Sequence, residues 1–371
     1  MRIAIDCADL DHQRIDGTRV YIKNLLTYFG KLDRQSEFLL YHQKNFNPTL
    51  KPPIFPNYVE RKIPYSFWWT QTRLAFELKK DRADVLWMPI QQLPYLIEKS
   101  RTRKIITIHD LAFKLFPEQF TSIDRFKLNL FTDYAVKRSD IIIAVSNSTK
   151  KDILKFYPKT SEDKIKVIYH GVDKEKFKFR DLSYRINPKL KIPCSQFILY
   201  LGAIQPRKNL GVLIEAFEKI KKEKDRKALK LVLAGGSAWM AEETLKKAKG
   251  SEFAQDIFLL GQVSFEEAVE LYNSAEIFVL PSLYEGFGMP ILEAWASGLP
   301  IIVSDNSSLA EIGAQASEKF KAEDVNELVF KIKLLLDNKE RRTKLVRKGY
   351  ERLKDFSWEK CARETLTEIK K

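Results

Sequence analysis

The chain has 371 residues, a formal net charge of +15 and 44% hydrophobic residues. This length exceeds a typical single core and fits two α/β domains of roughly 150–200 residues each, and the even spread of apolar residues excludes a mainly disordered chain. The longest uncharged apolar runs are far shorter than the roughly 20 residues that cross a bilayer, and the acidic Asp6 does not fit a secretory signal, so we expect a cytoplasmic protein.

The spacing of the cysteines and the distribution of charge further limit which class of protein this chain can be. Cys7, Cys194 and Cys361 lie far apart, are odd in number and lack metal-ligand spacing, which predicts buried free thiols. Residues 1–180 carry 33 Lys/Arg against 21 Asp/Glu, so +12 of the net charge lies there. Such a basic half suits nucleic acid, an anionic membrane surface or an acidic substrate, and a merely solvated surface is an equal alternative.

Short β-branched runs alternate with helical stretches along the first half, a pattern that predicts a parallel sheet with crossover helices. We expect strands at residues 3–6, 38–41, 85–88, 105–109, 141–145 and 166–168. We expect helices at residues 18–29, 70–80, 122–138 and 147–156.

The same alternation restarts after a basic, proline-containing stretch that ends near residue 193 and that we interpret as a connection between domains. The second half predicts strands at residues 197–201, 230–234, 257–260, 277–280 and 300–303, and helices at 209–222, 240–248, 265–273 and 290–296.

We therefore predict two Rossmann-like, doubly wound α/β domains that face a central cleft. The first spans residues 1–180, the second spans residues 181–355, and residues 356–371 form a C-terminal helix whose expected partner is the first domain. Ligands of such sheets bind beyond the carboxyl ends of the strands.

The segment LPSLYEGFGMPILEAWASGLPIIVSD, residues 280–305, carries the most chemical information. A strand ends at Leu280, a glycine-containing loop follows Glu285, and Pro290 suits a first helical turn. Free N–H groups and the helix dipole at such a helix start suit a diphosphate without a metal ion. The alternative is that Glu285 is a plain loop acid and that Glu293 merely lies near a helix N-terminus.

A second motif, LYLGAIQPRKNL at residues 199–210, ends a strand at Gly202 and places two cations just before a helix. Arg207 can bind a pyrophosphate through two parallel N–H groups, and Lys208 can bind it through its single positive charge. Both would act at the same sheet edge as the glycine loop. An exposed basic turn is the alternative interpretation.

At this point the sequence resembles glycosyltransferase family 4, the "group 1" retaining transferases with the GT-B fold. The resemblance covers nearly the whole chain, and its most specific part is EGFGMPILE, in which Glu285 and Glu293 are separated by seven residues. LGAIQPRKNL, LVLAGG, LGQVSFEEAVELYNSAEIFVLPS, TIHDL, VSNSTKKDI and VIYHGVD support it in order and spacing.

The resemblance implies a role for each matching position. Arg207 and Lys208 would contact the donor diphosphate, Glu285 the hydroxyls of the transferred sugar and Glu293 the ribose. His109, in TIHDL, resembles the histidine near the reacting sugar, with a core histidine as the alternative. Backbone groups would complete the diphosphate cradle at Gly286, Phe287, Gly288 and Met289. The base would lie near Gly235, Gly236, Gly261 and Val263.

Two segments depart from the family pattern. Many relatives have a first loop with two or more glycines over the diphosphate, whereas RIDGTRVYIKNLL has only Gly17, which we expect to act as a loop hinge. The Gly-Asp-Ala-Ala pattern of the family is also blurred at residues 309–317.

The resemblance implies transfer of a hexose from a nucleotide-diphosphate sugar to a saccharide or lipid-linked saccharide, in cell-surface polysaccharide synthesis and without a metal or other cofactor. GDP-mannose is the favoured donor, and UDP-glucose stays open. A nucleotide-sugar epimerase or phosphorylase shares the architecture. An epimerase would convert the donor sugar without any acceptor, so incubation of the enzyme with donor alone distinguishes it from a transferase. A nucleic-acid module has only the charge to support it, since no known motif is present.

The location of the enzyme is a further expectation. Basic clusters at residues 61–62, 79–80, 101–104 and 150–151 could draw the first domain to the cytoplasmic face of an anionic membrane. The aromatic run at residues 65–69 is either an acceptor or membrane patch or, as we favour, packing for the following helix.

Overall fold

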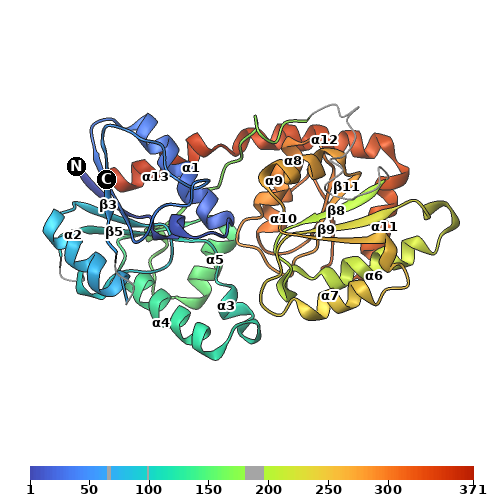
Figure 1. Ribbon diagram of the computed structural model, residues 1–371, viewed down its shortest axis with the longest axis horizontal. Helices are drawn as coiled ribbons and strands as arrows, with labels where there is room; N and C mark the ends of the chain where they lie inside the picture. Colours follow the sequence, from blue (N-terminus) through green and yellow to red (C-terminus); the bar gives the residue numbers. More distant parts are fainter. Residues whose placement is uncertain (65–67, 98–99, 180–195) are drawn as a thin grey trace. The chain divides into compact units, whose positions relative to one another are not determined.

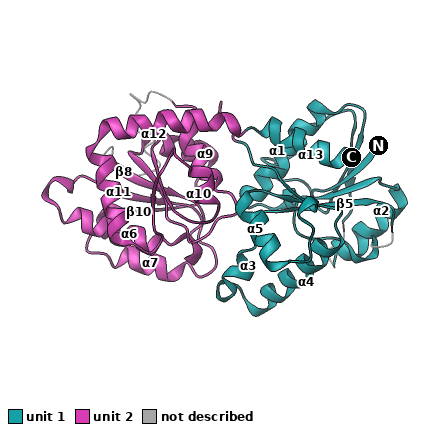
Figure 2. Cartoon of the chain, turned by 180° about the vertical axis from the view of Figure 1, so that it is seen from behind, with its two compact units in different colours: residues 1–171, 357–371 teal, residues 172–356 magenta. Residues whose placement is uncertain are grey.

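The computed structural model describes residues 1–64, 68–97, 100–179 and 196–371. These residues form two compact units, one of residues 1–171 and 357–371 and one of residues 172–356 (Figure 2). The predicted boundary near residue 180, most of the predicted connection, Cys194 and residues 65–67 of the aromatic run lie outside the described residues.

The first unit is built on a parallel sheet whose described strands run in the order β3-β2-β1-β4-β5-β6-β7. The strands are β1 (Arg2–Asp6), β2 (Glu37–His42), β3 (Tyr58–Lys62), β4 (Val85–Met88), β5 (Arg103–Ile108), β6 (Ile141–Ala144) and β7 (Ile165–Val167). The helices are α1 (Gly17–Leu32), α2 (Ala75–Asp81), α3 (Ala112–Leu115), α4 (Ser122–Arg138), α5 (Asn147–Phe156) and α13 (Trp358–Lys370). Helices α1 and α13 cover one face of the sheet, and α3 and α4 lie on the other side (Figure 1).

The second unit repeats the design with a parallel sheet in the order β10-β9-β8-β11-β12-β13. Its strands are β8 (Phe197–Leu201), β9 (Lys230–Ala234), β10 (Ile257–Gly261), β11 (Ile277–Leu280), β12 (Ile301–Ser304) and β13 (Glu318–Phe320). Its helices are α6 (Leu210–Lys221), α7 (Glu242–Lys249), α8 (Phe265–Ser274), α9 (Met289–Ala296), α10 (Ser307–Gly313), α11 (Val325–Asp337) and α12 (Lys339–Arg352). Helices α8 and α9 lie on one face of the sheet, and α6 and α7 on the other (Figure 1).

Both sheets have the strand order of doubly wound nucleotide-binding folds, with a reversal between the first and fourth strand of each unit. The predicted fold class is confirmed. The central strands β1, β4, β8 and β11 are buried along most of their length, because helices cover both of their faces. Reversal of the strand order leaves a crevice at the carboxyl edge, where ligands of such sheets bind.

The observed elements differ from the predicted ones at an edge strand, at the start of one helix and in several segments without a prediction. Strand β3, with the sequence YVERK, was not predicted because it is an exposed edge strand without an apolar face. The helix expected at 70–80 begins as a π-helical turn over Thr70–Leu74, here called η2, and becomes α-helical only at α2. The segments that form α3, β13 and α10 to α12 received no prediction.

The C-terminal helix completes the first unit. On α13, Trp358, Cys361 and Ile369 are buried, and Tyr21 of α1 lies 6.3 Å from Trp358 between ring centroids. A Cβ atom at Gly171 would lie 2.0 Å from the backbone nitrogen of Trp358, so glycine permits this close approach. No helix in the described parts of the chain combines the length and hydropathy needed to cross a membrane.

Candidate active site

Glycines end three neighbouring strands at the carboxyl edge of the second sheet. Gly202 and Gly235 follow β8 and β9, and Gly261 ends β10. The N–H of Gly202 donates to Ala234 O (2.9 Å), and the N–H of Gly235 donates to Gly261 O (2.7 Å). A Cβ at Gly235, whose φ is +142°, would lie 1.9 Å from Gly202 O. A side chain is thus excluded at Gly235, and Gly236 and Val263 follow the same edge.

The two candidate cations lie on a short turn after β8. Arg207 and Lys208 belong to a 3-10 turn (Pro206–Lys208) that ends at Asn209, which has a φ of +55°. The Asn209 amide donates to Ala322 O (2.6 Å), and the N–H of Leu283 donates to Arg207 O (2.8 Å). These contacts fix the turn against the loop after β11, although 77 residues separate Arg207 from Tyr284, whose carbonyl accepts from the Arg207 guanidinium (2.7 Å).

Glu285 joins the cations in one cluster. Its carboxylate lies 2.5 Å from Lys208 Nζ and 3.7 Å from an Arg207 nitrogen, and it accepts a hydrogen bond from Ser282 Oγ (2.7 Å). Burial opposes ionisation, but the charges of Lys208 and Arg207 and the hydrogen bonds outweigh it, so the pKa of Glu285 is lowered. Glu285 is therefore an anion that holds both cations at this edge.

The backbone around Glu285 is fixed as well. Its N–H donates to Ser307 Oγ (3.1 Å), and Ser308 Oγ donates to its carbonyl (2.9 Å). Phe287 is buried and packs edge-on against Phe356 at a centroid distance of 6.0 Å. Gly288 precedes α9 with a φ of +94°, and Met289 is the first helical residue. The segment from Gly286 to Met289 thus directs the start of α9 toward the sheet edge.

Glu293 has a separate environment on α9. Tyr272 donates its phenolic hydrogen to Glu293 Oε2 over 2.8 Å. Burial raises the pKa of Glu293 to about 7, and the Tyr272 hydrogen bond opposes this only in part. The two glutamates of the sequence motif therefore differ in ionisation, and Glu293 does not join the cation cluster.

In the first unit, His109 follows β5. A carbonyl accepts hydrogen bonds, so the contact between His109 Nε2 and Pro89 O (2.9 Å) places the proton of the neutral ring on Nε2 and leaves Nδ1 as an acceptor. Tyr21 packs edge-on at 5.0 Å, and His170 lies 5.6 Å away. Burial lowers the pKa of His109, which keeps the ring neutral near pH 7. Asp110 accepts from the N–H of Ala112 (2.9 Å) and fixes the following turn.

His109 lines a cavity of about 290 Å³ together with Asp9, Asp16 and Arg19. Gly17 is the first residue of α1, and Asp16 caps that helix by accepting from the N–H of Arg19 (3.2 Å). The Arg19 guanidinium pairs with Asp16 and lies 3.9 Å from an Asp9 oxygen. Gly17 therefore belongs to a capped helix start, and the hinge role expected for it stays a prediction.

Several site residues were not predicted from the sequence. Ser307 and Ser308 follow a strand in the run SDNSS, a helix-start signal that could have marked them. Asp16 and Arg19 flank Gly17 in DGTR and could have been found as a helix cap. Tyr272 lies 21 residues before Glu293, and no local pattern predicts that contact.

Two family models match the chain and together cover most of it. "Glycosyltransferase Family 4" matches residues 15–176, and "Glycosyl transferases group 1" matches residues 185–352. The second match contains Arg207, Lys208, Glu285 and Glu293, and the first contains Gly17 and His109.

Individual relatives point the same way. O-antigen chain mannosyltransferase B of Escherichia coli is 27% identical over 300 residues, which are 80% of this chain and 77% of that protein. O-antigen chain mannosyltransferase RfbU of Salmonella typhimurium is 34% identical over 200 residues, 54% of this chain and about half (51%) of the relative. The fold of Alr3699/HepE from Anabaena, solved in complex with UDP-glucose, matches with a TM-score of 0.77 at 16% identity and covers 100% of both chains.

Proposed function

Because the chain belongs to the group 1 glycosyltransferases of family 4, we propose that it moves a hexose, with retention of configuration, from a nucleotide-diphosphate sugar to a saccharide or lipid-linked saccharide. Mannose from GDP-mannose is the favoured donor, since two of the relatives described above are mannosyltransferases, and UDP-glucose is the second choice. The proposed setting is the synthesis of a cell-surface polysaccharide.

The cluster of Arg207, Lys208 and Glu285 carries this proposal. Arg207 and Lys208 place two positive charges against Glu285, four residues before α9 begins, and positive charge there would stabilise a leaving diphosphate. Glu285, fixed by Ser282 and ionised, is suited to accept hydrogen bonds from hydroxyls of the transferred sugar. A diphosphate that approaches Lys208 competes with Glu285 for it, so donor binding and Glu285 position are coupled.

The proposed chemistry breaks the bond between the anomeric carbon and the diphosphate oxygen. An acceptor hydroxyl oxygen then bonds to that carbon on the same face, and its proton goes to the departing phosphate. The chain's own contribution is fixed positive charge at the leaving group and correct placement of the reactants. No divalent metal has a role in this scheme, because Arg207, Lys208 and the α9 N-terminus supply the charge.

In the nucleotide site we assign the ribose to Glu293 and the base to the glycine edge at Gly235, Gly236, Gly261 and Val263. We assign the reacting sugar and acceptor to His109, whose Nδ1 can accept a hydroxyl hydrogen bond. The enzyme would act in the cytoplasm, with its basic first unit in peripheral contact with anionic lipid.

A panel of GDP-, UDP- and ADP-sugars tests the donor in a thermal-shift assay. A ligand at 100 times its Kd adds roughly 2.7 kcal/mol of stability, so the true donor should stand out. Incubation of that donor with and without acceptor then separates transfer from epimerisation, and the anomeric coupling constant of the product tests retention. Failure of every nucleotide sugar to stabilise the protein would refute the assignment of the donor site.

A further inference from the structure

A groove of about 590 Å³ lies within the first unit, between η2 and the N-terminal half of α4. On one side it is lined by Trp68 and Trp69, and on the other by Ile123, Phe126 and Leu130. The donor chemistry proposed above uses none of these residues.

The wall on the η2 side has little free hydrogen-bonding capacity, because Gln71 and Trp69 bond to the protein's own backbone. The Gln71 amide donates to Leu93 O (3.1 Å) and accepts from the N–H of Tyr95 (2.8 Å). The Trp69 indole donates to Ile63 O (3.3 Å). A saccharide would find few hydrogen-bond partners on this wall, whereas a hydrocarbon chain would lose none.

Helix α4 has apolar residues on two sides, and only one side packs into the core. Ala135 and Val136 are buried, while Ile123, Phe126 and Leu130 are 66%, 67% and 45% exposed. Residues 123, 126 and 130 follow helical spacing, so they form one continuous outer stripe. Trp68, across the groove, is 58% exposed. Exposed apolar side chains gathered in this way on a described surface mark a binding site rather than scattered surface residues.

The groove adjoins the polar cavity that His109 lines. Gln92 and Phe131 line both spaces. Within one unit, an apolar groove thus lies next to a cavity lined by Asp9, Asp16 and His109, which suit sugar hydroxyls. Lys127 also lines the groove. Phe131 follows it by four residues, so the two side chains lie on the same side of α4.

We propose that this groove binds the hydrocarbon chain of an amphipathic acceptor, with Lys127 at the phosphate that joins the chain to its sugar. The proposal rests on the proposed function and specifies its acceptor as a lipid phosphate-linked saccharide. The chain lies along Trp68, Ile123, Phe126 and Leu130, and the saccharide extends past Gln92 toward His109.

A titration of the full-length protein with butyl, hexyl, octyl and decyl phosphate, each below its critical micelle concentration, tests the groove directly. Affinity should rise about fourfold for each added methylene that is buried. The Ile123→Ser/Phe126→Ser variant should bind decyl phosphate about tenfold or more weakly.

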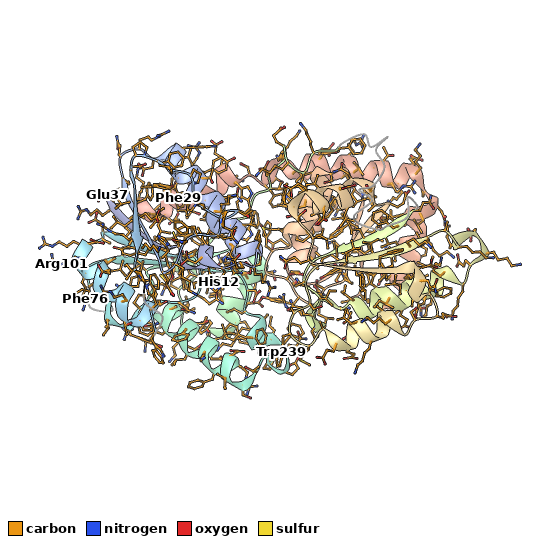
Figure 3. All side chains as sticks on the ribbon, in the orientation of Figure 1. His12, Phe29, Glu37, Phe76, Arg101 and Trp239 are labelled. Carbon is orange, nitrogen blue, oxygen red and sulfur yellow. The ribbon has the colours of Figure 1, made fainter. Side chains whose placement is uncertain are left out.

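Matched variants separate the groove from general surface effects. Ile54→Ser/Phe76→Ser also replaces one exposed isoleucine and one exposed phenylalanine of the first unit, at 90% and 59% exposure, away from the groove, and should bind like wild type. Phe76 lies on α2 at the periphery of that unit (Figure 3). Lys127→Gln should weaken decyl phosphate but not decanol, whereas Arg125→Gln, two residues away and not lining the groove, should affect neither.

Affinity that is independent of chain length, or equal loss in both double variants, would overturn the proposal. So would loss of co-sedimentation with phosphatidylcholine vesicles in Ile123→Ser/Phe126→Ser without any effect on decyl phosphate, since the stripe would then contact a lipid surface rather than hold one chain. These titrations contain no nucleotide sugar. Failure of the donor site would therefore appear only in the thermal-shift panel, and failure of the groove only here.

Discussion

The carboxyl edges of the two sheets share one topology and differ in chemistry. The second unit's edge has glycines, Arg207 and Lys208, and an ionised Glu285 with a lowered pKa. The first unit's edge has Asp6, whose pKa burial raises to about 7, Asp9, whose pKa burial also raises, and a neutral His109. One edge thus collects fixed positive charge, and the other collects hydrogen-bonding groups with weakened charge. The shared strand order sets where ligands bind, and local side chains set what binds.

Glu285 gives the sharpest test of this difference. Glu285→Ala and Glu285→Gln should each lower turnover by about 10²–10³-fold, because each removes the anion that places Lys208 and Arg207 and that we propose contacts the sugar. The loss should be seen in initial rates with saturating donor, while circular dichroism shows a retained fold. Glu323→Gln, an exposed glutamate of the same unit, is the control. Near-wild-type turnover in Glu285→Gln would remove this residue from the catalytic site.

The two cations should act on the donor diphosphate. Arg207→Ala and Lys208→Ala should each weaken binding of the free nucleoside diphosphate by about 2–4 kcal/mol, as expected for a desolvated charge contact. Arg207→Lys keeps the charge but loses the contact geometry to Tyr284 O, so it should fall between wild type and Arg207→Ala. Calorimetry with the nucleoside diphosphate measures these effects, and unchanged affinity in both alanine variants would place the clamp elsewhere.

Protonation of Glu293 allows a comparison between the units. The pKa of Glu293 in the folded protein, about 7, lies above its ordinary value of 4.5. Between pH 4.5 and 7 the folded protein therefore keeps a proton that the unfolded chain loses. The stability of the wild-type protein falls as the pH rises through this range. The difference in unfolding free energy between Glu293→Gln and wild type should therefore depend on pH. It should favour the variant by about 1–3 kcal/mol more at pH 8 than at pH 4. Urea denaturation at the two pH values measures this.

Asp6→Asn is the matched variant in the first unit, because Asp6 also has a pKa near 7. It should show the same direction of pH dependence, since its proton is likewise held only in the fold. Only Glu293→Gln should change nucleoside affinity. A nucleotide effect from Asp6→Asn would contradict the assignment of the ribose to the second unit.

The sequence predicted the strand and helix alternation because buried parallel strands are continuous apolar runs. It placed Arg207, Lys208, Glu285 and His109 at carboxyl ends of strands for the same reason. It did not predict that Lys208 pairs with Glu285, or that Tyr272 donates to Glu293, because those contacts depend on how distant loops meet at one sheet edge. The sequence does not predict the groove, because residues 122–138 have the pattern of a crossover helix and only the fold brings the apolar stripe on its outer side opposite Trp68 and Trp69.

Peripheral membrane contact should be weak, because the fold engages much of the first unit's basic charge. Arg61 pairs with Asp81 at 3.1 Å, Lys150 pairs with Glu162 at 2.8 Å, and Lys104 is buried. Each exposed basic residue contributes about 1 kcal/mol near anionic lipid, and Lys80 is largely exposed although its Nζ lies 3.8 Å from a Glu77 oxygen. Lys79→Gln/Lys80→Gln should reduce co-sedimentation with anionic liposomes at low salt, and Lys246→Gln/Lys247→Gln, at the same place on α7, should not. Equal binding to neutral liposomes would contradict an electrostatic contact.

The smallest expected effect is that of metal removal. In the second unit, Arg207, Lys208 and the N-terminus of α9 already provide positive charge at the proposed diphosphate position, so a divalent cation would add little and would be repelled by both side chains. Transfer in excess EDTA should therefore match transfer without chelator. Complete loss of transfer that added Mg²⁺ or Mn²⁺ restores would show that Arg207 and Lys208 do not suffice. In that case Asp9→Asn provides the next comparison, because Asp9 is a carboxylate at the carboxyl edge of the first unit's sheet. If Asp9→Asn weakens the Mg²⁺ rescue and Lys208→Ala does not, the charge that drives departure of the diphosphate would come from the first unit rather than the second.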